Sequence, residues 1–398
     1  MSVTTDGGER VAWDPWNAEI FADPHPTLRR LRNEAPLYRN DEHDFWALSR
    51  FADVEGALKD HATFSSAKGD ILELIQSDIE LPPGTVIMED PPDHTEHRKL
   101  MSRVFTPRKV ADLEPQIRQY CADCLDPLIG TDRFDLIEDF GSQMPTRVIG
   151  MLFGIPEEDQ AAIRDRTDSN LRTEKGEKMK ADGNMVNEQF AQYIDWRAEH
   201  PSDDLITELM HATFTDRDGS QRTLTRQELL TYISVIVGAG NETTNRLIGW
   251  TGKLLADHPD QRRDIVEDRG LIPGTIEEVL RYEPPGPGVA RYVTSDVEFH
   301  GQTVPAGSAI VLLVAAANRD ERRWNDPDRF DIHREQLSHL TFGYGIHFCL
   351  GASLARIQGR IALEELLKRF PTWETDGEAR LSQTSTVRGF ESLKLAVS

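Results

Sequence analysis

The feature that most constrains the fold is a glycine-rich segment that places a cysteine at the start of an amphipathic helix. The segment covers residues 342–351 and reads FGYGIHFCLG. Leu350, Leu354, Ile357 and Ile361 then recur at spacings of four, three and four, which predicts a helix with one apolar face. Backbone N–H groups at a helix start favour a thiolate, and a thiolate there is a natural metal ligand. The alternative is a buried structural cysteine.

A long helix is predicted through the middle of the chain. Thr225 and Glu228 form a capping-box pattern, and apolar residues continue to Trp250 before His258-Pro259 ends the helix. About 30 residues at ~1.5 Å each span on the order of 45 Å, so this helix should cross the core. Its middle, 238–244 (GAGNETT), holds two glycines that each cost roughly 1 kcal/mol relative to alanine. Either close packing against a neighbouring helix or a functional role would explain them.

Composition and local patterns set the fold class. The chain has 398 residues with 38% hydrophobic and 28% charged side chains, a globular balance. Helices are predicted over 26–34 and 51–60, a hairpin-like stretch over 37–48, and mostly helices from about residue 91 onward. We find no repeat or long linker. We therefore expect a mainly α protein with smaller β-sheets (α+β) that forms a single domain over residues 1–398.

Charge and cysteine content narrow the environment. Asp and Glu number 68 and Lys and Arg 45, a net charge of −23 that disfavours nucleic acid. Three cysteines imply no disulfide framework, which fits a reducing cytoplasm. Cys121 and Cys124 lack the following histidine of a haem-attachment motif, so we expect them to pack within a helix. The N-terminus is polar and the apolar stretch 229–240 is short, which predicts a soluble protein without a membrane anchor.

Four motifs in order resemble those of the cytochrome P450 family. Segment 342–351 resembles the family's haem-ligand loop, with Cys349 as the thiolate ligand of the iron. Glu278 and Arg281 resemble its Glu-x-x-Arg pair, which ties a helix to the loop below the haem; alone, they would suggest a surface ion pair. Segment 238–244 resembles the oxygen-activation motif, and Arg291 matches a strand arginine that binds a haem propionate.

The resemblance implies a P450-like fold with haem b between the central helix and the cysteine loop. His94 and Arg98 are four residues apart and share a helix face suited to a carboxylate, although a solvated helix start would look similar. A zinc site there is less favoured, since no third ligand is evident. His347 resembles a propionate-binding histidine; its alternative is a free surface imidazole. The expected haem contacts are His94, Arg98, Ala239, Arg291, Phe342, Gly345, His347, Cys349 and Gly351.

The implied reaction is insertion of one oxygen atom from O2 into an organic substrate. Glu242 and Thr243 match the acid–alcohol pair that delivers protons, and Gly240 would leave space for dioxygen. Electrons would come from NAD(P)H through a separate ferredoxin and ferredoxin reductase. The alternatives are a peroxide-driven peroxygenase, which needs no acid–alcohol pair, and a haem sensor or electron carrier, which needs no open iron position.

By the same resemblance, the substrate pocket is apolar. Its expected lining is Val86, Ile87, Val235, Ala239, Thr243, Pro287, Val289 and Phe390, which favours a sterol-like, terpenoid, fatty-acyl or macrolide substrate. A lid is expected around 179–186. A mixed basic cluster is either a solvated face or a docking surface for an acidic ferredoxin. Its members are Arg98, Lys99, Arg103, Arg108, Lys109, Arg356 and Arg360.

Overall fold

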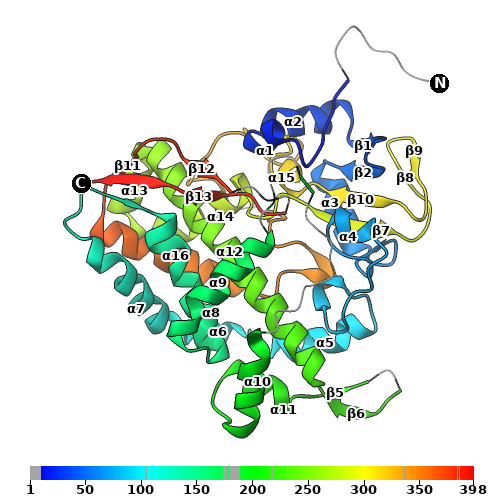
Figure 1. Ribbon diagram of the computed structural model, residues 1–398. Coiled ribbons are helices and arrows are strands. Elements are labelled where there is room, and N and C mark those ends of the chain that lie inside the picture. Colours follow the sequence, from blue (N-terminus) through cyan, green and yellow to red (C-terminus); the bar gives the residue numbers. More distant parts are fainter. Residues whose placement is uncertain are drawn as a thin grey trace.

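The computed structural model describes residues 10–398 except 104, 172, 174–176, 179–188, 217, 336–337, 383 and 385. The expected lid, 179–186, lies outside the described residues. Helices make up most of the described chain, and the sheets are small: the largest lies on the right in Figure 1, and β11 and β13 lie at the upper left. The predicted fold class, mainly α with smaller β-sheets, is confirmed.

Helices carry the body of the molecule. The described α-helices are α1 Ala18–Ala22, α2 His25–Glu34, α3 Phe51–Lys59, α4 Leu72–Ile75, α5 Asp93–Ser102, α6 Pro107–Ala111, α7 Glu114–Leu125, α8 Gln143–Phe153, α9 Glu157–Leu171, α10 Gln189–Glu199, α11 Leu205–His211, α12 Arg226–Asp257, α13 Pro259–Glu267, α14 Ile272–Tyr282, α15 Val314–Ala317 and α16 Ala352–Arg369. Short 3-10 turns include η1 Val86–Met88 and η5 Gly345–His347, and η3 Ile137–Gly141 is a π-helical turn. The helices predicted over 26–34 and 51–60 correspond to α2 and α3.

The largest sheet has five strands in the order β1-β2-β10-β7-β3. Its strands are β1 Leu37–Asn40, β2 Phe45–Leu48, β3 Phe64–Ser65, β7 Val289–Val293 and β10 Ala309–Leu312. β1 and β2 pair antiparallel, which confirms the predicted hairpin. The smaller sheets use β4 Arg133–Asp135, β5 Thr213–Thr215, β6 Gln221–Thr223, β8 Val297–Phe299, β9 Gln302–Val304, β11 Trp373–Thr375, β12 Arg380–Leu381, β13 Phe390–Ser392 and β14 Lys394–Val397.

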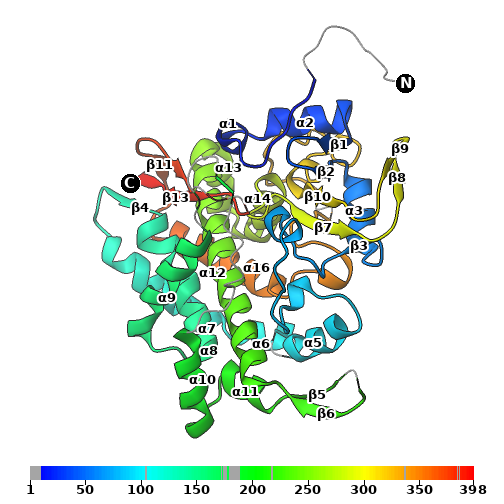
Figure 2. The same cartoon turned by 45° about the vertical axis from the view of Figure 1, so that its right-hand side comes forward.

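Helix α12 runs through the core, as its sequence predicts (Figure 2). Thr225 accepts from the N–H of Glu228, and the Glu228 carboxylate accepts from the N–H of Thr225, so the capping box is present. At Gly240, an added Cβ would lie 2.7 Å from Cδ1 of Ile149 on α8. Close packing therefore accounts for a residue without a side chain here, and the expected space for dioxygen stays a prediction.

The main core joins α7, α8, α12, α14 and α16. Cys121 and Cys124 lie inside it on α7, and burial raises the pKa of both thiols. The interpretation of these two cysteines as helix packing is confirmed.

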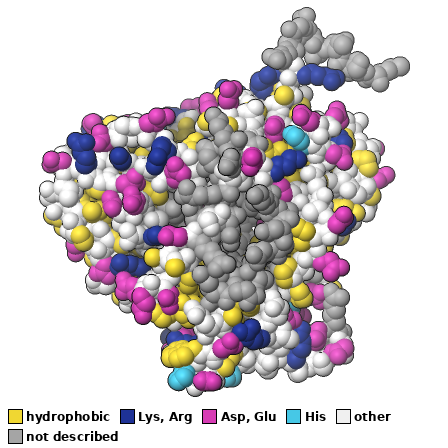
Figure 3. Space-filling view, viewed as in Figure 1, with side chains coloured by type: hydrophobic (Ala, Val, Ile, Leu, Met, Phe, Trp, Pro, Cys, Tyr) yellow, Lys and Arg dark blue, Asp and Glu magenta, His cyan; other side chains and the backbone are white. Residues whose placement is uncertain are grey.

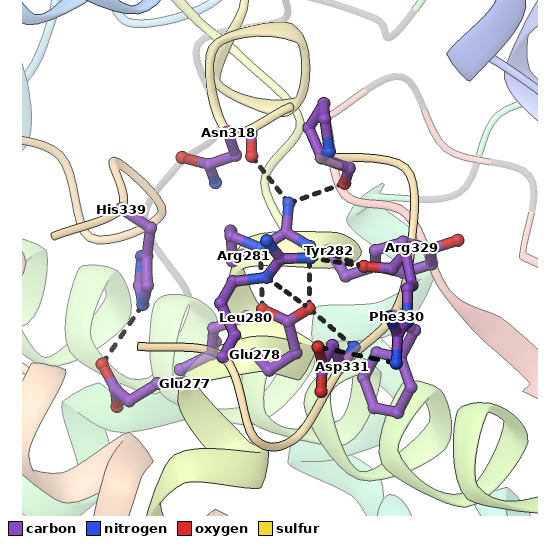
Figure 4. Close-up of polar contacts among 12 residues, drawn as sticks. Glu277, Glu278, Leu280, Arg281, Tyr282, Asn318, Arg329, Phe330, Asp331 and His339 are labelled. Atoms are coloured by element: carbon purple, nitrogen blue, oxygen red, sulfur yellow. Dashed lines mark hydrogen bonds and ion pairs between the residues drawn. The ribbon is translucent and has the colours of Figure 1, made fainter. Parts of the chain in front are cut away.

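A buried ion pair connects α14 to the segment that follows α15. Arg281 donates to both carboxylate oxygens of Glu278 at 2.7 and 2.8 Å, and the two side chains are 2% and 4% exposed. Arg281 Nη1 also donates to the carbonyls of Asn318 and Pro327, each at 2.9 Å (Figure 4). Because the pair is buried and reaches distant backbone, the surface ion-pair alternative is excluded.

We expect Arg281→Ala to lower the free energy of unfolding by about 3–5 kcal/mol, because it leaves the Glu278 carboxylate buried without its main counter-charge. Arg30→Ala is the control, since Arg30 pairs with Glu34 at 2.9 Å where the side chains are 44% and 51% exposed. That exposed pair should contribute less than about 1 kcal/mol. Urea unfolding followed by circular dichroism measures both variants, and equal losses would contradict the role given to Arg281.

Candidate functional site

The cysteine loop is shaped by its backbone. Gly343 and Gly345 have φ values of +68° and +69°, a conformation that side chains other than glycine rarely adopt. A Cβ on Gly345 would lie 2.8 Å from the carbonyl oxygen of Leu58 on α3. The N–H of Cys349 donates to the carbonyl of Phe342 at 2.8 Å, and Gly351 is the N-cap of α16. Cys349 therefore lies just before a helix start, as predicted.

The Cys349 sulfur is largely surrounded by protein, and its side chain keeps an exposed face. Burial raises the pKa of its thiol, whereas the N–H groups of Gly351 and Ala352 and the positive charges of Arg98 and Arg356 lower it. Burial outweighs these groups, so the helix start alone does not produce the thiolate that the sequence suggested. A bound metal ion would supply the remaining stabilisation of the negative sulfur.

Donor groups without an anionic partner gather beside this loop. The rings of His94 on α5 and His347 are 4.3 Å apart, and the Nε2 atom of each is buried without a hydrogen-bond partner in the described chain. Burial, aided by Arg98, lowers the pKa of His94 to about 4. Burial, aided by Arg291, lowers the pKa of His347 to about 3. Both imidazoles are therefore neutral at pH 7.

Arg291, on β7, is 5% exposed, and in the described chain its guanidinium donates a hydrogen bond only to the carbonyl of Ala290, at 2.8 Å. Arg98 donates to the carbonyl of Phe348. A guanidinium buried this deeply is costly without a nearby anion. Arg98, Arg291 and the two histidines thus fit the carboxylates of an anionic cofactor such as haem.

One face of α12 stays uncovered in an otherwise buried helix. Val235, Ala239 and Thr243 lie four residues apart, and each is exposed or half-buried, while most neighbouring positions are buried. Thr243 donates its hydroxyl to the carbonyl of Ala239 at 2.7 Å. The predicted alcohol therefore lies on the open face, as an oxygen-activating group requires.

The predicted acid, Glu242, is buried and pairs with Arg246. Their side chains are 6% and 2% exposed and meet at 2.7 Å, and Arg246 also donates to the carbonyl of Phe390. A Cβ on Gly389 would lie 2.4 Å from Cδ of Arg246, so this glycine makes room for the arginine. We did not single out Arg246 from the sequence, although its spacing of four from Glu242 was a usable signal.

The predicted substrate-pocket residues differ in exposure. Ile87 is 37% exposed, and Pro287 and Val289 are half-buried. Val86 and Phe390 are buried, each 4% exposed. The Phe390 ring packs 4.6 Å from that of Trp250. The lining proposed from the sequence therefore includes core side chains as well as open ones.

The predicted basic cluster is partly neutralised by the chain's own acids. Arg356 pairs with Glu277 at 2.7 Å, and Arg360 pairs with Glu114 and Glu364. Lys99 and Lys109 pair with Glu96 and Glu208 at 2.6 and 2.8 Å. Elsewhere too, acidic and basic side chains are intermixed, as on the face in Figure 3.

Comparison with known proteins decides the family. A family model described as Cytochrome P450 matches residues 168–390. The protein named "Putative cytochrome P450 123" of Mycobacterium tuberculosis is 37% identical over 98% of both chains. The chain belongs to the cytochrome P450 family. The solved structure of P450 CYP109Q5 from Chondromyces apiculatus shares its fold with a TM-score of 0.85 and 33% identity, covering 97% of this chain and 98% of that one.

A second solved P450, CYP109E1 of Bacillus megaterium in complex with testosterone, has a TM-score of 0.86 and 30% identity over 96% of this chain and 99% of that one. Family membership makes the protein a haem-dependent monooxygenase that uses a substrate, O2 and redox partners. Among the described residues, no helix is both long enough and apolar enough to span a membrane.

We expect Gly345→Ala to destabilise the P450 more than Gly301→Ala. Gly301 has a φ of +74° with open space around it, so alanine there meets only backbone strain of roughly 1–2 kcal/mol. At Gly345 a similar strain is joined by the contact with the Leu58 carbonyl. Thermal unfolding of the two variants gives the comparison, and similar losses would mean that α3 moves aside.

Proposed function

We propose that this P450 inserts one oxygen atom from O2 into a hydrophobic organic substrate, and that Cys349 would hold haem b as its thiolate ligand. The observation that carries the proposal is the Cys349 sulfur at the start of α16, beside donor groups that lack an anionic partner. A haem with a thiolate ligand supplies the electron density that favours O–O cleavage. The residues of this chain would then bind the haem, orient the substrate and deliver protons.

Side chains from distant parts of the chain would hold the haem. His94, Arg98, Arg291 and His347 would bind its propionates, because these donors converge and none of them is hydrogen-bonded to a carboxylate in the described chain. Phe342, Gly345 and Gly351 would shape the loop around the cysteine, and Ala239 would border the opposite face of the haem. The neutral imidazoles would donate N–H groups and the arginines would supply charge.

Proton delivery is assigned to Glu242 and Thr243. Thr243 has its hydroxyl on the open face of α12, where it would hold a proton donor near the oxygen. Glu242 would supply protons from the buried side of the helix, with Arg246 fixing its carboxylate. This pair favours O2 chemistry over a peroxide-driven peroxygenase, which needs no such relay. The exposed Ala239 favours an open iron position over a sensor or electron carrier.

The proposed substrate is hydrophobic. Its pocket would be lined by Val86, Ile87, Val235, Ala239, Pro287 and Val289, with Phe390 behind them. The testosterone complex of the related CYP109E1 protein supports a sterol-like or similarly apolar compound. Electrons would come from NAD(P)H through a separate ferredoxin and ferredoxin reductase, since no flavin or ferredoxin motif stands out in this chain. The positive charges of Arg98 and Arg356 near the sulfur support docking of an acidic ferredoxin there.

Replacing Cys349 with histidine tests the ligand assignment. The reduced carbon-monoxide complex of the parent should show the red-shifted absorption of thiolate ligation, and Cys349→His should lose it, because nitrogen replaces sulfur on the iron. The double variant Cys121→Ala, Cys124→Ala is the control and should keep the spectrum. Survival of the shift in Cys349→His would remove the basis of the proposed function.

Replacing Thr243 with alanine tests proton delivery. With a substrate found by screening for displacement of iron-bound water, Thr243→Ala should still bind substrate and consume reductant, but release mostly hydrogen peroxide instead of product. Thr244→Ala is the matched control, because Thr244 is 3% exposed and lies about 100° around the helix. The measurement is product and peroxide formed per reductant consumed. Equal coupling in both variants would show that the Thr243 hydroxyl is not on the proton path.

A further inference from the structure

A second pocket, of about 110 Å³, lies between the N-terminal segment and the largest sheet. It lies among residues 13–28 around α1 and α2, residues 70–73 at α4, and strands β7 and β10. In Figure 1, α1 and α2 lie at the top of the molecule, and α4, β7 and β10 lie below them on the right-hand side. A cavity of ~150 Å³ can hold a benzene ring. This pocket therefore suits a small head group rather than a whole sterol.

Aromatic rings form one side of this pocket. Trp13, Trp16 and Phe21 all line it, and the two tryptophans are each 7% exposed. Trp16 is fixed by its indole N–H, which donates to Glu73 at 3.0 Å. The ammonium of Lys178, which is not among the lining residues, lies 4.2 Å from the centre of the Trp16 ring. The Trp16 ring thus already accepts an alkylammonium ion on one face.

The charges lining the pocket are mostly negative. Asp14, Asp70 and Glu73 supply carboxylates, and Arg388 supplies the only guanidinium among the described lining residues. Arg388 is already satisfied: it pairs with the buried Glu283 and donates to the carbonyls of Phe21 and Ala22, each at 2.9 Å. The guanidinium of Arg388 is therefore already paired, and among the described lining residues three carboxylates stand against this one cation.

Asp70 is the lining carboxylate that makes no ion pair at contact distance with a described residue. Its backbone carbonyl accepts from the N–H of Ala290 at 2.7 Å, which holds it against β7. In the described part of the chain, no Lys, Arg or His side chain makes an ion pair with its carboxylate; Arg291 acts on it only at longer range. Burial raises the pKa of Asp70, so its charged form lacks the stabilisation that a bound cation would give.

We propose that this pocket binds a tertiary or quaternary ammonium group, held by the Asp70 carboxylate and the indole rings of Trp13 and Trp16. Aromatic rings beside one carboxylate are the combination that recognises such cations, because both attract positive charge and the rings tolerate the methyl groups. A carboxylic acid or phosphate would be repelled by the Asp70 carboxylate, and a neutral apolar group would leave Asp70 with only the more distant Arg291.

The location links the pocket to the substrate. Pro287 and Val289, which the proposed function places in the substrate pocket, also line this one. This inference rests on the proposed function: substrates with an apolar body and a basic amine are the class that would use both pockets. The ammonium site itself does not depend on how the iron is ligated, so the two can be tested separately.

Isothermal titration calorimetry of the haem-loaded protein with choline tests the site. The neutral isostere 3,3-dimethylbutan-1-ol replaces the charged nitrogen with carbon, and neither probe has an amine lone pair for the iron. Choline should bind roughly tenfold or more tightly than the alcohol. Asp70→Asn should weaken choline binding by a similar factor and leave the alcohol unchanged. Trp16→Leu should weaken choline binding as well, since it removes one of the indole rings that face the ammonium group.

Asp41→Asn is the matched control, because Asp41 is an exposed carboxylate outside the pocket, 91% exposed and 3.4 Å from Arg39. It should leave choline binding unchanged. Cys349→His should still bind choline, which separates this site from the haem assignment. Absence of choline binding, equal binding of choline and the alcohol, or full choline affinity in Asp70→Asn would each overturn the proposal. The last result would make Asp70 a structural counter-charge for Arg291.

Discussion

Arg281 holds a full positive charge in the interior, and the way the chain neutralises it determines the path of the segment leading to the cysteine. The guanidinium is shielded from water. It forms an ion pair with Glu278 and donates a hydrogen bond to the carbonyl of Asn318. The Asn318 side chain in turn accepts from the N–H of Leu340 at 2.8 Å and donates to Thr341 at 2.9 Å. Thr341 precedes Phe342, whose carbonyl accepts from Cys349. A short series of bonds thus connects α14 to the cysteine loop.

The site on the opposite side of this loop is shaped by desolvation rather than by charge alone. His94 and His347 are surrounded by protein and by arginines, which lower the pKa of both far enough that they are neutral above about pH 4. A neutral imidazole donates an N–H without adding charge, so the arginines carry the electrostatic attraction. This division lets the fold gather four donors in one place without four mutually repelling cations.

Local patterns predicted from the sequence were confirmed where the causes are local. The capping box of α12 and the hairpin of β1 and β2 follow from residues close together in the chain. Contacts between distant segments could not be predicted in this way. The role of Gly240 depends on Ile149, and the pairing of Arg360 depends on Glu114. Asp70 gave no signal, because its place in the pocket is visible only once the neighbouring strands are in place.

The side chain of Arg246 packs directly against Gly389, so the residue types at these two distant positions depend on each other. The arginine reaches the carbonyl of Phe390 by crossing the space that any side chain at 389 would fill. Descendants of this sequence could therefore accept a larger residue at 389 only together with a shorter one at 246, and Glu242 would then need a different buried partner. The three positions should change together during divergence, although only Glu242 belongs to the proposed acid–alcohol pair.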